Sequence, residues 1–408
     1  KPLVYLENTS DVVVDNAGQV LLINCNHIIV KNLNLSNTSV GVQLWQTNNT
    51  EIIGNNITHN VYGVHLSNSF HNSIIENSVI RNYQDGIALF ESSNNSVISN
   101  NIAKNYHNGI KLSCSSMNTI RRNNIIENHY YGISVSSQSS NNSITKNDIK
   151  NNGFSGVYLG GSYNHVTKNN IKNDCLRLYG FSNIIEENTF TRGGLSVWGI
   201  YPNIVKNNTV NGKPLVYLEG VVDQRVEDAG QVILVNCTGI RVENLNLSDT
   251  WVGVQLWNTN NTMISNNNIA NNRYGIDLLY STNNTIYKNN ITANNRGISF
   301  ILSSNNTINR NNLMQNQYGI WFLDSWNNKI YHNNFINNTQ QCGFPFFPNT
   351  WDNGYPLGGN YWSDYTGVDV YSGPFQNETG SDGIGDTSYV IDGYNCLLYT
   401  SPSPRDRG

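Results

Sequence analysis

A short apolar tetrapeptide that begins with glycine returns along most of this chain. In each copy the second residue is Ile or Val and the fourth is apolar, and neighbouring copies of a series start 22 to 24 positions apart. Self-similarity at a fixed period of this length is typical of solenoid proteins, whose repeats stack on one another. The copies start at Gly41, Gly63, Gly86, Gly109, Gly132 and Gly156, and again at Gly253, Gly275, Gly297 and Gly319.

The alternation inside each tetrapeptide is that of a half-buried strand, with one face apolar and the other polar. Two further short apolar pulses separate successive copies, such as Ile52 to Ile53 and Ile57 after the first one. Three short strands per coil of about 22 residues predict an all-β fold, a right-handed parallel β-helix. The side chains expected to point inward include Val42, Leu44, Val64, Leu66, Ile87, Leu89, Ile110 and Leu112.

Asparagine pairs recur in phase with the apolar pulses, for example at residues 48–49, 94–95 and 283–284. Asparagine tolerates left-handed backbone conformations and bonds to its own chain at turns. In stacked coils such residues lie above one another, so that their amides can form hydrogen-bonded ladders. Because the pairs keep phase with the strands, the polar stretches are better explained as turns than as disorder.

A second, longer repeat lies on top of the first. Residues 1–7 return letter for letter as residues 213–219, and residues 41–45 return as residues 253–257. We therefore expect two related modules, residues 1–212 and 213–340, within one solenoid. Cys25 and Cys237 occupy equivalent positions in them and are expected to be small buried residues rather than disulfide partners.

The composition favours an extracellular or cell-surface protein, or its periplasmic equivalent. Charged residues make up 13% of the chain, about half the usual share, and the net charge of −4 offers no basic field for nucleic acid. No run of about 20 apolar residues could span a bilayer. The chain starts at Lys1 in the middle of a repeat unit, which indicates an internal fragment of a longer protein.

The period stops near residue 340, and a different segment, residues 341–395, follows. Its aromatic residues, Trp351, Tyr361 and Trp362, are expected to fold over the last coil, because a solenoid needs its terminal apolar coil covered. The alternative is a calcium site, since carboxylates on a glycine-rich backbone are hard oxygen ligands, although the spacing does not match an EF-hand. The candidate ligands are Asp382 and Asp386, with Asp364, Asp369 or Asp392 nearby.

The repeat, together with segments 349–355, 359–365 and 382–387, resembles the NosD-like parallel β-helix proteins of the periplasmic copper-binding type. The resemblance covers residues 1 to about 395. It implies a secreted or surface setting and kinship with archaeal surface proteins, within a wider class of carbohydrate-binding proteins and sugar hydrolases. Residues 396–408 depart from the family and resemble a translated sequencing adapter, so we expect this tail to be non-native.

Copper binding is not predicted by the residues themselves. A copper site needs several imidazole or sulfur ligands that converge, and no two of the eight histidines share a strand face at a spacing of two. His65 is followed one coil later by Ala88 and then by Lys111, so its position does not repeat as a metal ligand. A copper-delivery accessory role stays an alternative that rests on the family resemblance.

Catalysis by a polysaccharide lyase or hydrolase would need clustered carboxylates or a positioned base. Asp277 and Asp324 stand alone in the repeat, so the enzyme is kept as an alternative. The leading hypothesis is a non-catalytic β-helix that serves as a surface scaffold or a glycan-binding rod, because aromatic faces stack on the C–H surface of sugars. Packing against neighbouring coils is an equal alternative for the candidate aromatics, which are Trp45, Phe90, Tyr158, Trp257, Tyr280 and Trp321.

Overall fold

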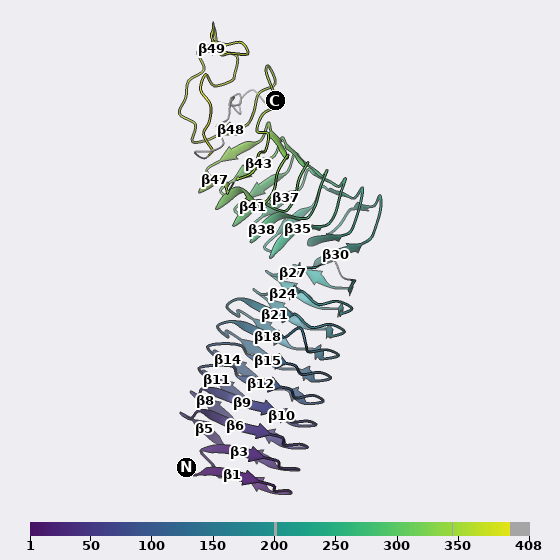
Figure 1. Ribbon diagram of the computed structural model, residues 1–408, viewed down its shortest axis with the longest axis vertical. Helices are drawn as coiled ribbons and strands as arrows, with labels where there is room; N and C mark the ends of the chain where they lie inside the picture. Colours follow the sequence, from purple (N-terminus) through teal and green to yellow (C-terminus); the bar gives the residue numbers. More distant parts are fainter. Residues whose placement is uncertain (200–201, 345, 392–408) are drawn as a thin grey trace. The chain divides into compact units, whose positions relative to one another are not determined.

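The computed structural model describes residues 1–199, 202–344 and 346–391. All regular elements in this part of the chain are strands, and those of each solenoid coil pair in parallel with the equivalent strands of the next coil (Figure 1). The predicted all-β parallel β-helix is thus confirmed. The chain divides into two units, Lys1–Gly212 and Lys213–Gly408, and each is described by itself. The predicted tail, residues 396–408, and Asp392 lie outside the described residues.

Three parallel sheets build the first unit. Sheet 1 contains β1 (Leu3–Glu7), β3 (Gln19–Ile23), β6 (Val40–Trp45), β9 (Tyr62–Ser67), β12 (Ile87–Phe90), β15 (Ile110–Ser113), β18 (Tyr131–Val135), β21 (Ser155–Leu159), β24 (Cys175–Leu178) and β27 (Gly194–Val197). Sheet 2 contains β2 (Val13–Val14), β4 (Ile29–Lys31), β7 (Glu51–Ile53), β10 (Ser73–Ile75), β13 (Ser96–Ile98), β16 (Thr119–Arg121), β19 (Ser143–Thr145), β22 (His165–Thr167), β25 (Ile184–Glu186) and β28 (Ile204–Lys206). Sheet 3 contains β5 (Asn34–Ser36), β8 (Asn56–Thr58), β11 (Ser78–Ile80), β14 (Asn101–Ala103), β17 (Asn124–Ile126), β20 (Asp148–Lys150), β23 (Asn170–Lys172), β26 (Thr189–Thr191) and β29 (Thr209–Val210).

The second unit repeats this plan. Sheet 4 contains β30 (Lys213–Glu219), β32 (Gln231–Val235), β35 (Val252–Trp257), β38 (Tyr274–Leu279), β41 (Arg296–Ile301), β44 (Tyr318–Leu323) and β47 (Gln340–Gly343). Sheet 5 contains β31 (Arg225–Val226), β33 (Arg241–Glu243), β36 (Met263–Ser265), β39 (Thr285–Tyr287), β42 (Thr307–Asn309) and β45 (Lys329–Tyr331). Sheet 6 contains β34 (Asn246–Ser248), β37 (Asn268–Ala270), β40 (Asn290–Thr292), β43 (Asn312–Met314), β46 (Asn334–Ile336) and β48 (Tyr361–Trp362), and β49 (Tyr371–Ser372) pairs antiparallel with β50 (Glu378–Thr379).

The core of each coil consists of the alternate apolar side chains of its three strands. The eight side chains predicted to point inward in residues 42–112 are all buried, which confirms the alternation. Cys25 and Cys237 are also buried, and neither forms a disulfide. Each thiol donates to two backbone carbonyls at equivalent positions, Leu6 and Ile23 in the first unit and Leu218 and Val235 in the second.

The repeat glycine marks a corner where two coils approach too closely for a side chain. A Cβ atom added at Gly63 would lie 2.3 Å from the carbonyl oxygen of Gly86 and 2.6 Å from a methyl carbon of Val79. Both distances are below van der Waals contact, so only glycine fits there. This close approach is the reason that the tetrapeptide begins with glycine.

Buried asparagines form ladders along the coils, as the sequence predicted. In the central ladder, Asn77 Oδ1 accepts from the backbone N of Asn55 at 2.9 Å and from Asn55 Nδ2 at 3.0 Å. Asn55 Nδ2 also donates to the Val30 carbonyl at 2.9 Å, so that both amide hydrogens are used. The ladder continues through Asn100, Asn123, Asn147, Asn169, Asn188 and Asn208.

The segment after the last coil covers the apolar end of the second unit. Trp351 and Trp362 are buried, and Tyr361 is half-buried. The Trp362 ring lies between Phe335 and Tyr389, with centroids 4.3 Å from each and interplanar angles of 15° and 3°. Trp351 and Trp362 thus pack on the core of the last coils, as expected from the sequence.

Candidate functional site

The outer face of sheet 1, the face turned away from the core, carries columns of side chains at matching positions of successive coils. One column holds the third residue of each tetrapeptide, as the sequence predicted. Backbone pairing places its members in register in the order Gln43, His65, Ala88, Lys111, Ser134, Tyr158 and Arg177. The spacing between neighbouring members is that of adjacent strands, about 4.8 Å.

A second column holds the residue that precedes each glycine. Side chains of this column lie beside those of the first column: the Tyr62 ring lies 5.4 Å from the His65 ring, and Asp85 Oδ2 lies 3.9 Å from Lys111 Nζ. The next members are Asn108 and Tyr131, whose carbonyls accept from the glycine amides of the preceding coils.

Asp85 is the centre of a polar cluster that also contains His107, Asn108 and Lys111, here called the Asp85 cluster. Asp85 Oδ1 lies 2.7 Å from His107 Nδ1 and accepts from the backbone N of Asn108 at 3.0 Å and from Asn108 Nδ2 at 2.7 Å. Lys111 Nζ lies 3.9 Å from Asp85 Oδ2. The carboxylate is buried, whereas the His107 and Lys111 side chains are each 40% exposed.

His107 Nδ1 has two polar neighbours, since Asn108 Nδ2 lies 2.8 Å from it in addition to Asp85 Oδ1 at 2.7 Å. In the tautomer with the proton on Nδ1, His107 donates to Asp85, because a carboxylate oxygen accepts. The lone pair of that tautomer lies on Nε2, in a side chain that is 40% exposed. Nearby, burial lowers the pKa of His65, while Asp85 opposes this shift and Lys111 adds to it.

Aromatic rings extend from the Asp85 cluster along the outer face. One stack runs from His107 through Tyr130 to Phe154, with centroid distances of 5.3 and 5.2 Å, and the Arg177 guanidinium lies 4.2 Å from the Phe154 ring centre. A second, parallel run contains Tyr131, Tyr158, Tyr179 and Trp198, with centroid distances of 5.0, 5.2 and 6.0 Å. On the other side of the cluster, residues of β6 and β9 and the turn before each line a shallow pocket of about 310 Å³ that includes Tyr62 and His65.

The three aromatic candidates in the first unit occupy different environments. Trp45 and Phe90 are 46% and 44% exposed and belong to one column of sheet 1, with Ser67 between them. Tyr158 is stacked on Tyr131 and near Tyr179, so both of its ring faces meet neighbouring coils. Trp45 and Phe90 therefore offer more aromatic surface to a ligand than Tyr158 does.

The three candidates in the second unit also differ. Trp257 is buried and lies 5.7 Å from the ring of Tyr280, which is exposed. Trp321 is half-buried, and the Arg296 guanidinium lies 3.5 Å from its ring centre. Of these three rings, Tyr280 has the largest exposed surface.

The middle of the outward column of sheet 4 is covered, although its residues there are polar. Gln255, Asp277 and Ser299 are in register and buried. Burial raises the pKa of Asp277 to about 6, and Oδ1 of this residue has no hydrogen-bond partner among the described residues. The sequence pattern predicted the direction of these side chains but not their burial.

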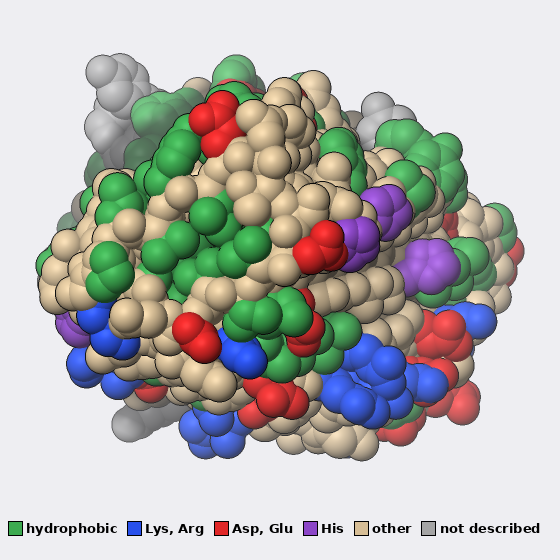
Figure 2. Space-filling model, turned by 90° about the horizontal axis from the view of Figure 1, so that it is seen from below, with side chains coloured by type: hydrophobic (Ala, Val, Ile, Leu, Met, Phe, Trp, Pro, Cys, Tyr) green, Lys and Arg blue, Asp and Glu red, His purple; other side chains and the backbone are tan. Residues whose placement is uncertain are grey.

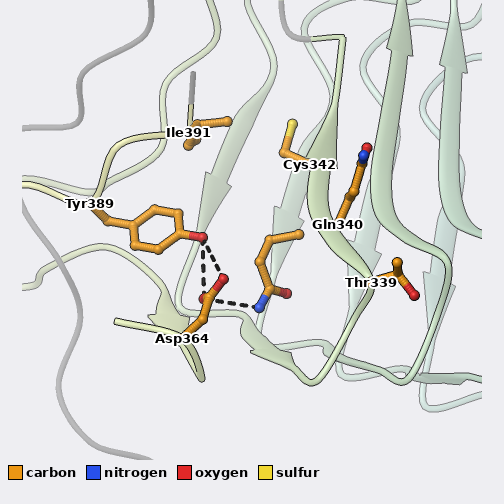
Figure 3. A pocket seen from close by; sticks show the side chains of 7 residues that line it. Thr339, Gln340, Cys342, Asp364, Tyr389 and Ile391 are labelled. Atoms are coloured by element: carbon orange, nitrogen blue, oxygen red, sulfur yellow. Dashed lines mark hydrogen bonds between the residues drawn. The ribbon is translucent and has the colours of Figure 1, made fainter. Parts of the chain in front are cut away.

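The carboxylates proposed as calcium ligands form hydrogen bonds within the capping segment. Asp369 accepts from the backbone N atoms of Asp382 and Gly383, and Asp386 accepts from those of Val370 and Tyr371. Figure 3 shows Asp364 and Tyr389 pointing toward each other in a pocket at the last coil, where the Tyr389 hydroxyl donates to both carboxylate oxygens at 3.2 and 3.1 Å. Burial and this carboxylate raise the pKa of Tyr389.

Copper prefers imidazole and sulfur ligands, whereas calcium prefers oxygen ligands. Within residues 1–199, 202–344 and 346–391, no three His, Cys, Asp or Glu side chains are grouped as metal ligands. The imidazole and sulfur donors that copper prefers therefore do not form a group of three ligands there.

In the same residues no helix could serve as a membrane span. Figure 2 shows basic, acidic and histidine side chains interspersed on the face it presents.

Asp85 and His107 were not recognised from the sequence. The two residues lie 22 positions apart in the sequence. Asp85 directly precedes Gly86, whereas His107 lies two residues before Gly109. An alignment of the repeats on their glycines, extended two residues upstream, would have placed Asp85 beside Asn108 and hence next to His107. The pattern of alternation alone could not, because the bend at the glycine interrupts it.

Several solved structures are similar to this chain at low sequence identity. The A-module of a mannuronan C-5 epimerase from Azotobacter vinelandii is 13% identical, with a TM-score of 0.29 over 82% of this chain and 89% of its own. A DFA-IIIase from Arthrobacter chlorophenolicus is 11% identical, with a TM-score of 0.35 over 68% and 66%. A tailspike protein of the E. coli bacteriophage HK620, in complex with a pentasaccharide, is 11% identical, with a TM-score of 0.35 over 79% and 71%. At such identities the likeness is one of fold alone.

Sequence comparison gives the family. No curated protein matches the chain. The family model described as periplasmic copper-binding protein (NosD) matches twice, over residues 4–180 and 181–367. These two matches together span most of the sequence, and the stacked coils are those that the resemblance implied. The chain belongs to the NosD family.

Proposed function

We propose that this protein binds polysaccharide on the outer face of sheet 1, as an exported β-helix of the periplasm, the cell surface or the surrounding medium. The observation that carries the proposal is the combination on one face of two exposed rings, Trp45 and Phe90, with the hydrogen-bonding groups of the Asp85 cluster. Sugars are bound by such combinations, in which rings cover C–H surface and polar groups pair with hydroxyls.

The geometry of a solenoid suits a polymeric ligand. Columns of sheet 1 present side chains at a regular spacing of about 4.8 Å along the stacking direction. The polar and aromatic side chains described above extend over successive coils from β6 to β24, so a linear glycan could contact several coils at once. The family description supports a location outside the cytoplasm.

A glycan array followed by titration tests the proposal. We expect binding to one or more polysaccharides, and about a three- to tenfold loss of affinity for Trp45→Ala and for Phe90→Ala, the range for loss of one aromatic contact. Tyr163→Ala is the matched control, because this exposed tyrosine lies outside sheet 1. An array without any bound glycan would contradict the proposal and leave the scaffold role.

A further inference from the structure

The Asp85 cluster has the arrangement of a general base. A buried carboxylate that accepts from Nδ1 holds the imidazole in one tautomer and stabilises the charge formed when the other nitrogen takes a proton. Asp85 is held in turn by the backbone and side-chain amides of Asn108, at 3.0 and 2.7 Å. The nitrogen that would accept the proton, His107 Nε2, belongs to a side chain that is 40% exposed.

The first column brings further polar side chains beside the cluster. Ala88, which is buried, lies between His65 and Lys111 in that column, so these two longer side chains start about 10 Å apart. Asp85 lies beside Lys111 and His107 on the side of the second column. A sugar ring bound over the cluster would meet the partly exposed imidazole of His107 and the partly exposed ammonium group of Lys111.

The residue types around Asp85 favour proton removal next to a carboxylate over glycoside hydrolysis. Glycoside hydrolysis uses two carboxyl groups on either side of the bond, but the neighbours of Asp85 in its column are Tyr62 and Asn108, and those in the first column are His65, Ala88 and Lys111. A base beside a cation instead suits removal of a proton next to a carboxylate, because the cation stabilises the negative charge that develops on the carboxylate oxygens.

We propose that His107, positioned by Asp85, removes the proton from the carbon next to the carboxylate of a uronate residue in an acidic polysaccharide, with Lys111 bound to that carboxylate. This inference rests on the proposed function, since the polymer must first bind to sheet 1. The C–H bond breaks, an N–H bond forms at Nε2, and the electron pair moves toward the carboxylate. When the neighbouring C–O bond breaks, this pair becomes a C=C bond, and the proton passes from His107 to the departing oxygen. The products are an unsaturated uronate end and a free hydroxyl.

The full chain should be incubated with polygalacturonate, alginate and hyaluronate in deuterated buffer. Ultraviolet absorbance detects the unsaturated product, and mass spectrometry detects deuterium next to the carboxylate. We expect product or deuterium with one of these polymers, at a rate that falls at least about 100-fold in His107→Gln, the lower range for loss of a general base. Lys111→Met should also lower the rate. His165→Gln, which replaces an exposed histidine on β22 of sheet 2, should leave it unchanged.

Binding measured in parallel separates this inference from the proposed function. His107→Gln should keep the melting temperature of wild type and lose at most about tenfold in affinity for the polymer, the range for one hydrogen bond, because Trp45, Phe90 and the other polar groups of the cluster remain. If a uronate polymer binds but neither product nor deuterium forms, the catalytic inference is wrong and the binding function stands. Equal rates in wild type and His107→Gln would also overturn it. If no polysaccharide binds, both proposals fail.

Discussion

At the scale of single residues, Asp174 takes the place of an asparagine in a buried ladder. Its Oδ2 accepts from the backbone N and from Nδ2 of Asn152 at 3.0 and 2.9 Å, the two bonds that an asparagine oxygen accepts elsewhere. Burial raises the pKa of Asp174 to about 7, although the two bonds from Asn152 act in the opposite direction. A carboxyl in this position is therefore favoured when it is protonated.

The substitution Asp174→Asn should make the protein less sensitive to pH. In the unfolded chain this carboxyl ionises near pH 4, whereas the folded protein keeps the proton until about pH 7. The contribution of Asp174 to stability is thus full below pH 4 and is lost as the pH rises through 7. We expect the variant to melt several degrees above wild type at pH 8 and to differ less at pH 4. Melting curves over this range test the prediction, with the exposed Asp15→Asn as control; parallel profiles for wild type and Asp174→Asn would contradict it.

At the scale of elements, the asparagine ladders join one coil to the next. Asn123 Oδ1 accepts from the backbone N and Nδ2 of Asn100, and Asn123 Nδ2 donates to the Val97 carbonyl. Asn123→Ala leaves these buried groups without partners, at a cost of about 1–3 kcal/mol for each. We expect a loss of at least about 3 kcal/mol in urea unfolding. The neighbouring Asn124→Ala, whose side-chain bond is exposed, should change stability by less than about 0.5 kcal/mol; equal effects of the two substitutions would argue against the ladder as a stabilising element.

We expect the stability of the cap in the second unit to depend more on Trp362 than on the exposed rings of the capping segment. Trp362 is buried between Phe335 and Tyr389. Its replacement by alanine removes a large core side chain, which typically costs about 3–5 kcal/mol. We expect Trp362→Ala to lower the unfolding midpoint strongly, and Phe375→Ala, which removes an exposed ring, to have little effect. Thermal and urea unfolding of both variants measure this, and similar midpoints would show that the ring does not hold the cap.

The calcium hypothesis for the same segment has its own test. If calcium binds at Asp369, Asp382 and Asp386, calorimetric titration should show heat of binding and a higher melting temperature, and Asp386→Asn should abolish both. Absence of heat and of any shift in melting temperature would leave these carboxylates with the backbone hydrogen bonds they form in the structure.

At the scale of the whole molecule, the sequence predicted the coils better than the site. Alternation placed Val42 and Leu44 in the core, because inward and outward positions of a strand follow from its period of two. It did not predict the contact of Asp85 with His107, which depends on the bend before the glycine. It also did not predict the burial of Asp277, since a strand pattern contains no information about what packs on its outer side.

The tail, residues 396–408, should be dispensable for the fold. Its resemblance to an adapter gives it no shared history with the coils, and Pro402 and Pro404 suit neither a strand nor a buried cap. Deletion of these residues should leave the melting temperature unchanged within error. A drop of several degrees would show that the tail belongs to the fold.

The asparagine ladders also divide each coil into a part that resists change and a part that permits it. The ladder asparagines of one coil, as in Asn95, Asn100 and Asn105, are five residues apart, whereas the arc from the last of them to the first ladder asparagine of the next coil varies from 12 to 14 residues between Asn60 and Asn164. Sheet 1 and its outer face lie on that arc. Insertions and deletions can accumulate there while the frame stays intact, so natural variation or an engineer can reshape the outer face of sheet 1 without redesigning the core beneath it.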